Sequence, residues 1–399
     1  MLGKVVFFLN KMMLLLPQPL YNFFQSKLTY FHFYQNINSN PSVTTQKHIL
    51  ISYITNPLEN DKSKLTGHTN NNECLAIIKT FIDLGYAIDL VHCLDKSHNS
   101  IIKQKKYNII FGFGEPFYSA SKNNYTAVKI VYLTELHPEF SLKMELERLK
   151  YFHDRHKKSA SLKRSGKFIR TRDVDIADYA ILMGNEYTSK ITKFSQDRLY
   201  TIKPTGLMNP DYIFKPRDLN QSRKNFIWFG SYGAIHKGLD ILIDVFKLLP
   251  EYNLFICGLD RREKNLFKLN YKNIHDLGFI NIKSKEFICL MDSCSYVILP
   301  SCSEGMATAV LTCMNHGLIP IVTRECGIDL LDWGFYLDDY HIGFLREKII
   351  ECANYDIELL EKQHKQIFNY SREQFNLQRY SQDFEQIIVN ILSKEEIIT

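Results

Sequence analysis

Apolar runs of strand length alternate with segments of helical spacing along two stretches of the chain. The runs of the first stretch are His48–Ile54, Ala87–Leu94, Tyr107–Gly114, Ala127–Leu136, Asp178–Gly184 and Leu199–Gly206. Those of the second stretch are Asn225–Ser231, Tyr252–Gly258, Ile274–Ile280, Ser295–Ser301 and Leu318–Arg324. Near-continuous apolar strands are typical of parallel sheets that helices cover on both faces. The pattern predicts an α/β fold with two doubly wound, Rossmann-like domains and a cleft between them.

Changes in polarity set the expected domain boundaries. An aromatic and aliphatic extension covers residues 1–46, and the first domain covers residues 47–207. Residues 208–224 are polar, contain two prolines and lack periodicity, as expected of an interdomain linker. The second domain covers residues 225–377, and we expect a terminal helix, about residues 378–399, to cross back to the first domain.

The first 35 residues are too interrupted to cross a membrane. Asn10, Lys11 and Pro17 break the apolar run well short of the roughly 20 residues that a spanning helix needs. Pro-Gln-Pro follows the apolar core, where a signal peptide would have small residues. Two alternatives remain: an anchor that lies in the membrane interface, or an extension packed on the first domain or on a partner.

Composition agrees with an ordinary soluble globular protein. Hydrophobic residues make up 45% of the chain, charged residues make up 23%, and the formal net charge is +6. The nine cysteines include no C-x-x-C pair, which predicts reduced thiols in a cytoplasmic protein rather than a zinc site.

The segment Leu299–Thr323 reads as strand, glycine turn, helix and strand, with the carboxylate of Glu304 at the start of the helix. Helix N-termini present unpaired N–H groups and a partial positive charge, which suit phosphates and sugar hydroxyls. Gly305 would let a ligand approach the backbone closely, and Glu304 can accept hydrogen bonds from two adjacent hydroxyls. The alternative is a carboxylate that the helix dipole alone favours.

A second glycine-rich strand–turn–helix lies upstream and carries Lys237 at its helix start. A lysine is unfavourable beside the positive end of a helix. A bound diphosphate would remove the conflict by pairing with both Lys237 and the helix amides. Two such turns in one domain predict a pocket for a nucleotide-diphosphate sugar.

These two turns, "FGS…HKGLDILIDVF" and "PSCSEGMATAVLTCMNHGLIPIVT", resemble the donor domain of retaining GT-B glycosyltransferases of the family-4 (glycosyl transferases group 1) type. The resemblance covers about Leu199–Thr323, including the linker "PTGLMNPDYIFKP"; it is weaker over His48–Gly184 and absent before Gln46. It implies the GT-B fold and transfer of a sugar from a nucleotide sugar to a hydroxyl of a carbohydrate or lipid-linked acceptor, with retention. It also implies that no metal and no resident cofactor take part. The implied setting is surface polysaccharide or glycolipid synthesis in the cytoplasm, peripheral on the inner face of the plasma membrane.

The resemblance assigns roles in the donor site. Glu304 is expected to contact the donor sugar and Lys237 the diphosphate. A second family glutamate falls at Thr312, which offers a hydroxyl but no charge, and a family arginine falls at Ser231. Either Arg261 or Arg262 is a candidate for the missing cation. The remaining donor residues that it implies are Gly305, Met306, Ala307 and Thr308.

In the first domain the resemblance points to loops that follow strands. His137 is a third catalytic candidate, in addition to Glu304 and Lys237, although a histidine after a strand is more often structural. The acceptor-side candidates are Gly67, His68, Asn70 and Glu115, and the loop of the first three has the alternative of simply capping a helix.

Three further patterns have simpler explanations or open alternatives. "GFGEPF" lacks the third glycine of a nicotinamide fingerprint, and "DVD" at Asp173–Asp175 precedes a strand in a charged run, which indicates surface rather than a metal site. Residues 148–172 hold ten Lys and Arg against one Asp. This run is either a solvated helix face and loop or a basic surface for anionic lipid headgroups or a lipid-diphosphate acceptor. Its few aromatics disfavour nucleic acid.

Two other functions remain open at this stage. An epimerase-like sugar-nucleotide enzyme would need a resident acid/base pair, and none is evident. A non-catalytic sugar-nucleotide-binding protein is the second alternative, because the second glutamate of the family is missing.

Overall fold

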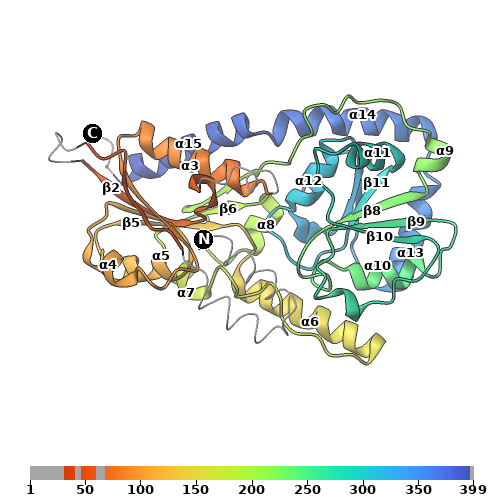
Figure 1. Cartoon of the computed structure of the whole chain (residues 1–399), viewed down its shortest axis with the longest axis horizontal. Coiled ribbons are helices and arrows are strands. Elements are labelled where there is room, and N and C mark those ends of the chain that lie inside the picture. Colours follow the sequence, from red (N-terminus) through yellow and green to blue (C-terminus); the bar gives the residue numbers. More distant parts are fainter. Residues whose placement is uncertain (1–30, 41–45, 60–67, 396–399) are drawn as a thin grey trace, which may run out of the picture.

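The computed structural model describes residues 31–40, 46–59 and 68–395, which form two α/β domains side by side along the long axis of the molecule (Figure 1). The predictions made for residues 1–30 and for Gly67 lie outside the described residues. Within the described residues, no helix is long and apolar enough to cross a membrane.

The first domain is built on a seven-stranded sheet with the strand order β1-β3-β2-β4-β5-β6-β7. All neighbours are parallel except the edge pair β1 and β3. Its central strands are buried over nearly their whole length, as their continuous apolar runs predict. The strands are β1 Tyr34–Ile37, β2 His48–Tyr53, β3 Ala87–His92, β4 Ile109–Gly112, β5 Val128–Leu133, β6 Tyr179–Met183 and β7 Leu199–Ile202.

Part of the predicted N-terminal extension belongs to this sheet, as β1. The backbone N–H of Asn36 donates to the carboxylate of Asp89 in β3 at 2.9 Å. Asp89 is buried and also accepts from Tyr107 Oη and Lys105 Nζ. A buried carboxylate needs such partners, so β1 is tied to the first domain by the satisfaction of Asp89.

Helices cover both faces of this sheet. They are α3 Asn70–Asp83, α4 Asn99–Gln104, α5 Gly114–Ser121, α6 Pro138–His156, α7 Thr171–Asp175, α8 Glu186–Ile191 and, from the far end of the chain, α15 Leu377–Lys394. Phe384 of α15 lies in the core of the first domain against Phe81 and Phe111, with ring centroids 6.2 and 5.6 Å away.

The second domain has a six-stranded, all-parallel sheet with the order β10-β9-β8-β11-β12-β13. Its strands are β8 Asn225–Phe229, β9 Asn253–Cys257, β10 Ile274–Gly278, β11 Tyr296–Leu299, β12 Ile319–Val322 and β13 Phe335–Tyr336. Its helices are α9 Leu219–Ser222, α10 Leu239–Phe246, α11 Lys285–Ser293, α12 Thr308–Met314, α13 Ile342–Ala353 and α14 Ile357–Gln374. The strand order reverses between β8 and β11, which is where doubly wound sheets bind ligands.

Two segments of chain connect the domains. The first follows β7, and the second is the break between α14 and α15 (Figure 1). They meet where Gly206 N–H donates to Phe375 O at 3.0 Å. A Cβ on Gly206 would lie 2.9 Å from the backbone C and O atoms of Leu311, so glycine is needed at this crossing.

Candidate functional site

The two glycine-rich turns of the second domain meet because they follow neighbouring strands. One turn follows β8 and the other follows β11, and these strands pair in parallel at the switch point of the sheet. The carboxyl ends of parallel strands lie at one edge, so both turns are presented on the same side.

Lys237 and Glu304 form a buried ion pair across these turns. Lys237 Nζ donates to Glu304 Oε1, and Ser301 Oγ donates to the same oxygen at 2.9 Å. Each of the two residues is 6% exposed. Burial by itself raises the pKa of Glu304, but the charges of Lys237 and Arg164 outweigh burial and lower it to about 2. Glu304 is therefore an ionised carboxylate at neutral pH.

Neither residue stands on a helix. Lys237 precedes α10, which begins at Leu239 after Gly238 in the left-handed conformation, and Glu304 lies in the loop before α12, which begins at Thr308. The expectation of a carboxylate at a helix start is therefore wrong for Glu304.

Several backbone amides of the two turns have partners within the chain. The N–H of Glu304 donates to Glu325 O at 3.1 Å, and that of Ala307 donates to Cys326 O at 3.0 Å. In the upstream turn, the buried carboxylate of Glu263 accepts from Gly233 N at 2.8 Å and from Ala234 N. An internal anion thus occupies the amides of the glycine turn.

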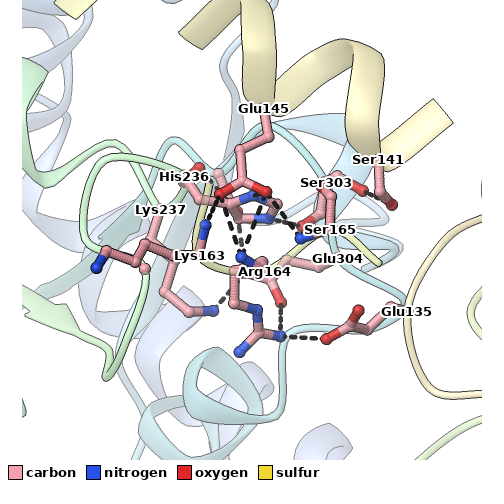
Figure 2. A network of polar contacts seen from close by, with 12 residues as sticks. Glu135, Ser141, Glu145, Lys163, Arg164, Ser165, His236, Lys237, Ser303 and Glu304 are labelled. Atoms are coloured by element: carbon pink, nitrogen blue, oxygen red, sulfur yellow. Dashed lines mark hydrogen bonds and ion pairs between the residues drawn. The ribbon is translucent and has the colours of Figure 1, made fainter. Parts of the chain in front are cut away.

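A segment of the first domain completes the site. Arg164 Nη2 lies 2.9 Å from Glu135 Oε1 and 3.8 Å from Glu304 Oε2. Glu145 of α6 holds the segment in place, because its carboxylate accepts from the backbone N–H groups of Lys163 and Ser165 at 2.7 and 2.8 Å and from that of Arg164 (Figure 2).

His236 links this segment to the turn that follows β8. Its Nε2 contacts Ser303 O at 2.5 Å, and its Nδ1 lies 3.8 Å from Glu145 Oε2. Burial lowers the pKa of His236, but Cys302, Glu145 and Glu304 outweigh burial and raise it to about 10. A protonated His236 balances the charge of Glu145. The site therefore contains positive and negative side chains from both domains.

Comparison with known proteins identifies the second domain. Residues 213–331 match the family model described as Glycosyl transferases group 1. Over these residues, the second domain of this chain belongs to the glycosyl transferases group 1 family. No curated protein matches the chain.

Solved structures show that the chain has the GT-B fold. Sucrose-phosphate synthase from Thermosynechococcus elongatus aligns with a TM-score of 0.57 and 12% identity, over 88% of this chain and 100% of that chain. A glycosyltransferase from Rickettsia africae aligns with a TM-score of 0.52 and 14% identity, over 87% and 99%. WaaG, described as a glycosyltransferase involved in lipopolysaccharide biosynthesis, aligns with a TM-score of 0.51 and 15% identity, over 86% and 98%. The chain spans 54% of the length of TarM, at a TM-score of 0.48. The two-domain GT-B prediction is confirmed.

The remaining donor candidates have varied surroundings. Thr312 Oγ1 donates to Thr308 O at 2.9 Å and accepts from Leu207 N at 3.1 Å, so its hydroxyl proton is used within the chain. Ser231 and Arg261 are exposed, whereas Arg262 forms an ion pair with Asp260. Met306 and Ala307 are buried, and Thr308 is half-buried.

Gly305 lies close to another backbone, but that backbone belongs to the first domain. A Cβ on Gly305 would lie 2.6 Å from Met183 O and 2.9 Å from Thr134 O. The glycine therefore allows the two domains to approach each other. In this arrangement the space beside Gly305 is taken by the first domain and not by a ligand as expected.

The first-domain candidates that the structure describes have partners or positions of their own. His137 caps α6, accepting from Glu139 N at its Nδ1 at 3.3 Å, and burial lowers its pKa, so its ring is neutral with the proton on Nε2. Glu115 pairs with Arg172 at 2.5 Å. His68 is exposed, and Asn70 begins α3 and is half-buried.

The basic run 148–172 is not simply a solvated face, and this is the part of the site that sequence reasoning missed. Arg148 is buried over the ring of Tyr340, and Arg155 forms ion pairs with Asp240 and Asp244 of α10. The run therefore holds the two domains together. Nothing in the sequence singles out Glu145, because it is one of several acidic residues in α6.

Neither the "DVD" motif nor any other cluster among the described residues forms a metal site. Asp173 of "DVD" accepts from the N–H groups of Gly114 and Arg170, both at 3.1 Å, and is buried rather than on the surface as expected. Among residues 31–40, 46–59 and 68–395, no three His, Cys, Asp or Glu side chains are grouped to hold a metal. A cavity of about 370 Å³ lies elsewhere, near the two segments that connect the domains. Residues of both domains line it, including Asn185, Lys203, Asp329 and Arg379.

Proposed function

We propose that this glycosyltransferase moves a sugar from a nucleotide-diphosphate sugar to a hydroxyl of a carbohydrate or lipid-linked acceptor. The observation that carries the proposal is the buried Lys237–Glu304 pair at the switch point of the donor domain. An ammonium group and an ionised carboxylate side by side suit a ligand that joins a diphosphate to a polyhydroxylated ring.

The two side chains have different parts in the proposed reaction. The leaving diphosphate gains charge as the glycosidic bond breaks, and Lys237 stabilises that charge from a fixed position. Glu304, ionised because its pKa is about 2, accepts hydrogen bonds from hydroxyls of the donor sugar. The cation does the work that a metal ion does in other transferases, so the proposed reaction needs no metal and no resident cofactor.

Donor entry requires the domains to move apart. Lys237 and Glu304 are nearly buried, and Gly305 contacts strand ends of the first domain. We therefore propose that the donor enters an open form and that closure excludes water during transfer.

Retention at the anomeric carbon and a role in surface polysaccharide or glycolipid synthesis belong to the proposal as well. The resemblance of the two turns to retaining enzymes supports the first. The fold shared with WaaG, whose description names lipopolysaccharide biosynthesis, supports the second. Cytoplasmic location with peripheral membrane contact through residues 1–35 is part of the same proposal.

Incubation of the protein with a panel of nucleotide sugars tests the activity. We expect free nucleoside diphosphate to appear only when a suitable acceptor is present, with the acceptor gaining the mass of one sugar. An isomerised donor would indicate an epimerase-like enzyme instead. Binding of a donor without turnover over a broad acceptor panel would indicate a binding protein.

A further inference from the structure

The donor turn is short of positive charge for the ligand proposed above. Ser231 stands where the family arginine is expected, Glu263 already occupies the amides of Gly233 and Ala234, and Lys237 is paired with Glu304. A diphosphate carries at least two negative charges, so one shared lysine does not balance it.

A cationic segment of the first domain lies directly against this turn. The side chain of Arg164 packs on Gly233 so closely that a Cβ there would be 2.8 Å from Arg164 Cγ. Next to it, Lys167 and Lys163 approach the ring of Tyr232, with Nζ 4.5 and 5.7 Å from the centroid. The loop after α6 thus brings three cations to the turn that lacks one.

The arrangement is held in place and yet unfinished. Glu145 fixes the backbone of residues 163–165, and Glu135 fixes one end of the Arg164 guanidinium (Figure 2). The buried Nε of Arg164 has no hydrogen-bond partner in the described structure. Burial lowers the pKa of Lys167, and the charges of Arg164 and Arg262 lower it further, as expected where positive charge is in excess.

We propose that Arg164, with Lys167 beside it, binds the diphosphate of the donor from the first domain and replaces the arginine that the donor turn lacks at Ser231. This inference rests on the proposed function. The donor would then be held by cations of both domains, so that closure and diphosphate binding occur together.

Calorimetric titration of the full-length protein with nucleoside diphosphates and with the matching nucleosides tests this role. Arg164→Ala should weaken binding of the preferred diphosphate by about 10- to 100-fold, as for the loss of one charge-assisted hydrogen bond, and leave nucleoside affinity unchanged. Lys167→Ala should have a smaller effect of the same kind. Lys150→Ala is the matched control, because Lys150 belongs to the same basic run and pairs with Asp154 on the exposed face of α6.

A rescue variant separates recognition from folding. Adding Ser231→Arg to Arg164→Ala should restore most of the diphosphate affinity, because residue 231 is exposed at the same turn. Unchanged diphosphate affinity in Arg164→Ala, or an equal loss of nucleoside affinity that Ser231→Arg does not restore, would overturn the inference alone. If the wild-type protein binds no nucleoside diphosphate, the proposed function fails and the inference fails with it.

Discussion

Two buried clusters of charge lie at opposite ends of one short stretch, residues 237–244, and they differ in what holds them. At one end Lys237 pairs with Glu304 of its own domain, and Arg164 of the other domain approaches. At the other end Asp240 and Asp244 pair with Arg155 of α6, and His156 lies 2.9 Å from Asp244. The second cluster joins the domains, whereas the first contains the ion pair that we propose a charged ligand takes over. If so, similar chemistry serves ligand recognition in one cluster and domain assembly in the other.

Removal of Lys237 should have the largest effect. Lys237→Ala should lower turnover by about 10²- to 10³-fold, because a positioned cation no longer meets the charge that develops on the leaving group. Steady-state rates with saturating donor measure this, with thermal unfolding recorded in parallel. Turnover equal to the wild type would remove Lys237 from the mechanism.

Removal of Arg155 tests the assembly cluster. Arg155→Ala leaves the buried Asp240 without its ion-pair partner and should lower the free energy of unfolding by about 3 kcal/mol, although Asp244 keeps Lys247. Urea denaturation measures the loss. Lys150→Ala, which breaks an exposed ion pair of the same helix, should change stability by less than about 1 kcal/mol. Equal effects of the two variants would contradict the comparison.

Another buried carboxylate, Glu73, sharpens the contrast because no cation pairs with it in the described structure. It accepts hydrogen bonds from Thr205 N and Oγ1 at 2.7 and 2.8 Å, in the segment that follows β7 and leads to the second domain. Burial raises its pKa from 4.5 to about 7 although these hydrogen bonds lower it, so the folded protein binds this proton more tightly than the unfolded chain. Stability from Glu73 should therefore fall by about 3 kcal/mol as pH rises from about 4.5 to about 7.

Glu73→Gln removes this titration. The difference in unfolding free energy between the variant and the wild type should shift in favour of the variant from pH 5 to pH 8, as denaturation at both values would show. A difference independent of pH would mean that Glu73 does not titrate in this range.

The smallest expected effect concerns an uncharged contact. Thr312→Val removes the acceptor for Leu207 N–H at the connection between the domains and should cost about 1 kcal/mol of stability. Nucleoside titration decides between this role and the donor-site role that the family resemblance implied for Thr312. If Thr312→Val costs more binding free energy for the nucleoside than unfolding free energy, Thr312 contacts the donor.

The sequence predicted the parts that depend on local pattern. Continuous apolar runs identified the strands of both sheets, and adjacent strands at a switch point bring Lys237 and Glu304 together as their motifs implied. It did not predict Arg164, because that contact depends on how α6 crosses to the other domain. Nor did it show that Glu263 occupies the glycine-turn amides, since the two segments are distant along the chain.

The return of α15 to the first domain has a consequence for engineering. Phe384, Ile388 and Ile391 are fully buried, and they come from the last twenty residues that the structure describes. A gene fragment that stops at the interdomain linker would lack one wall of its own hydrophobic interior. Chimeras that exchange acceptor specificity between such enzymes must therefore carry two pieces of DNA, one from each end of the reading frame.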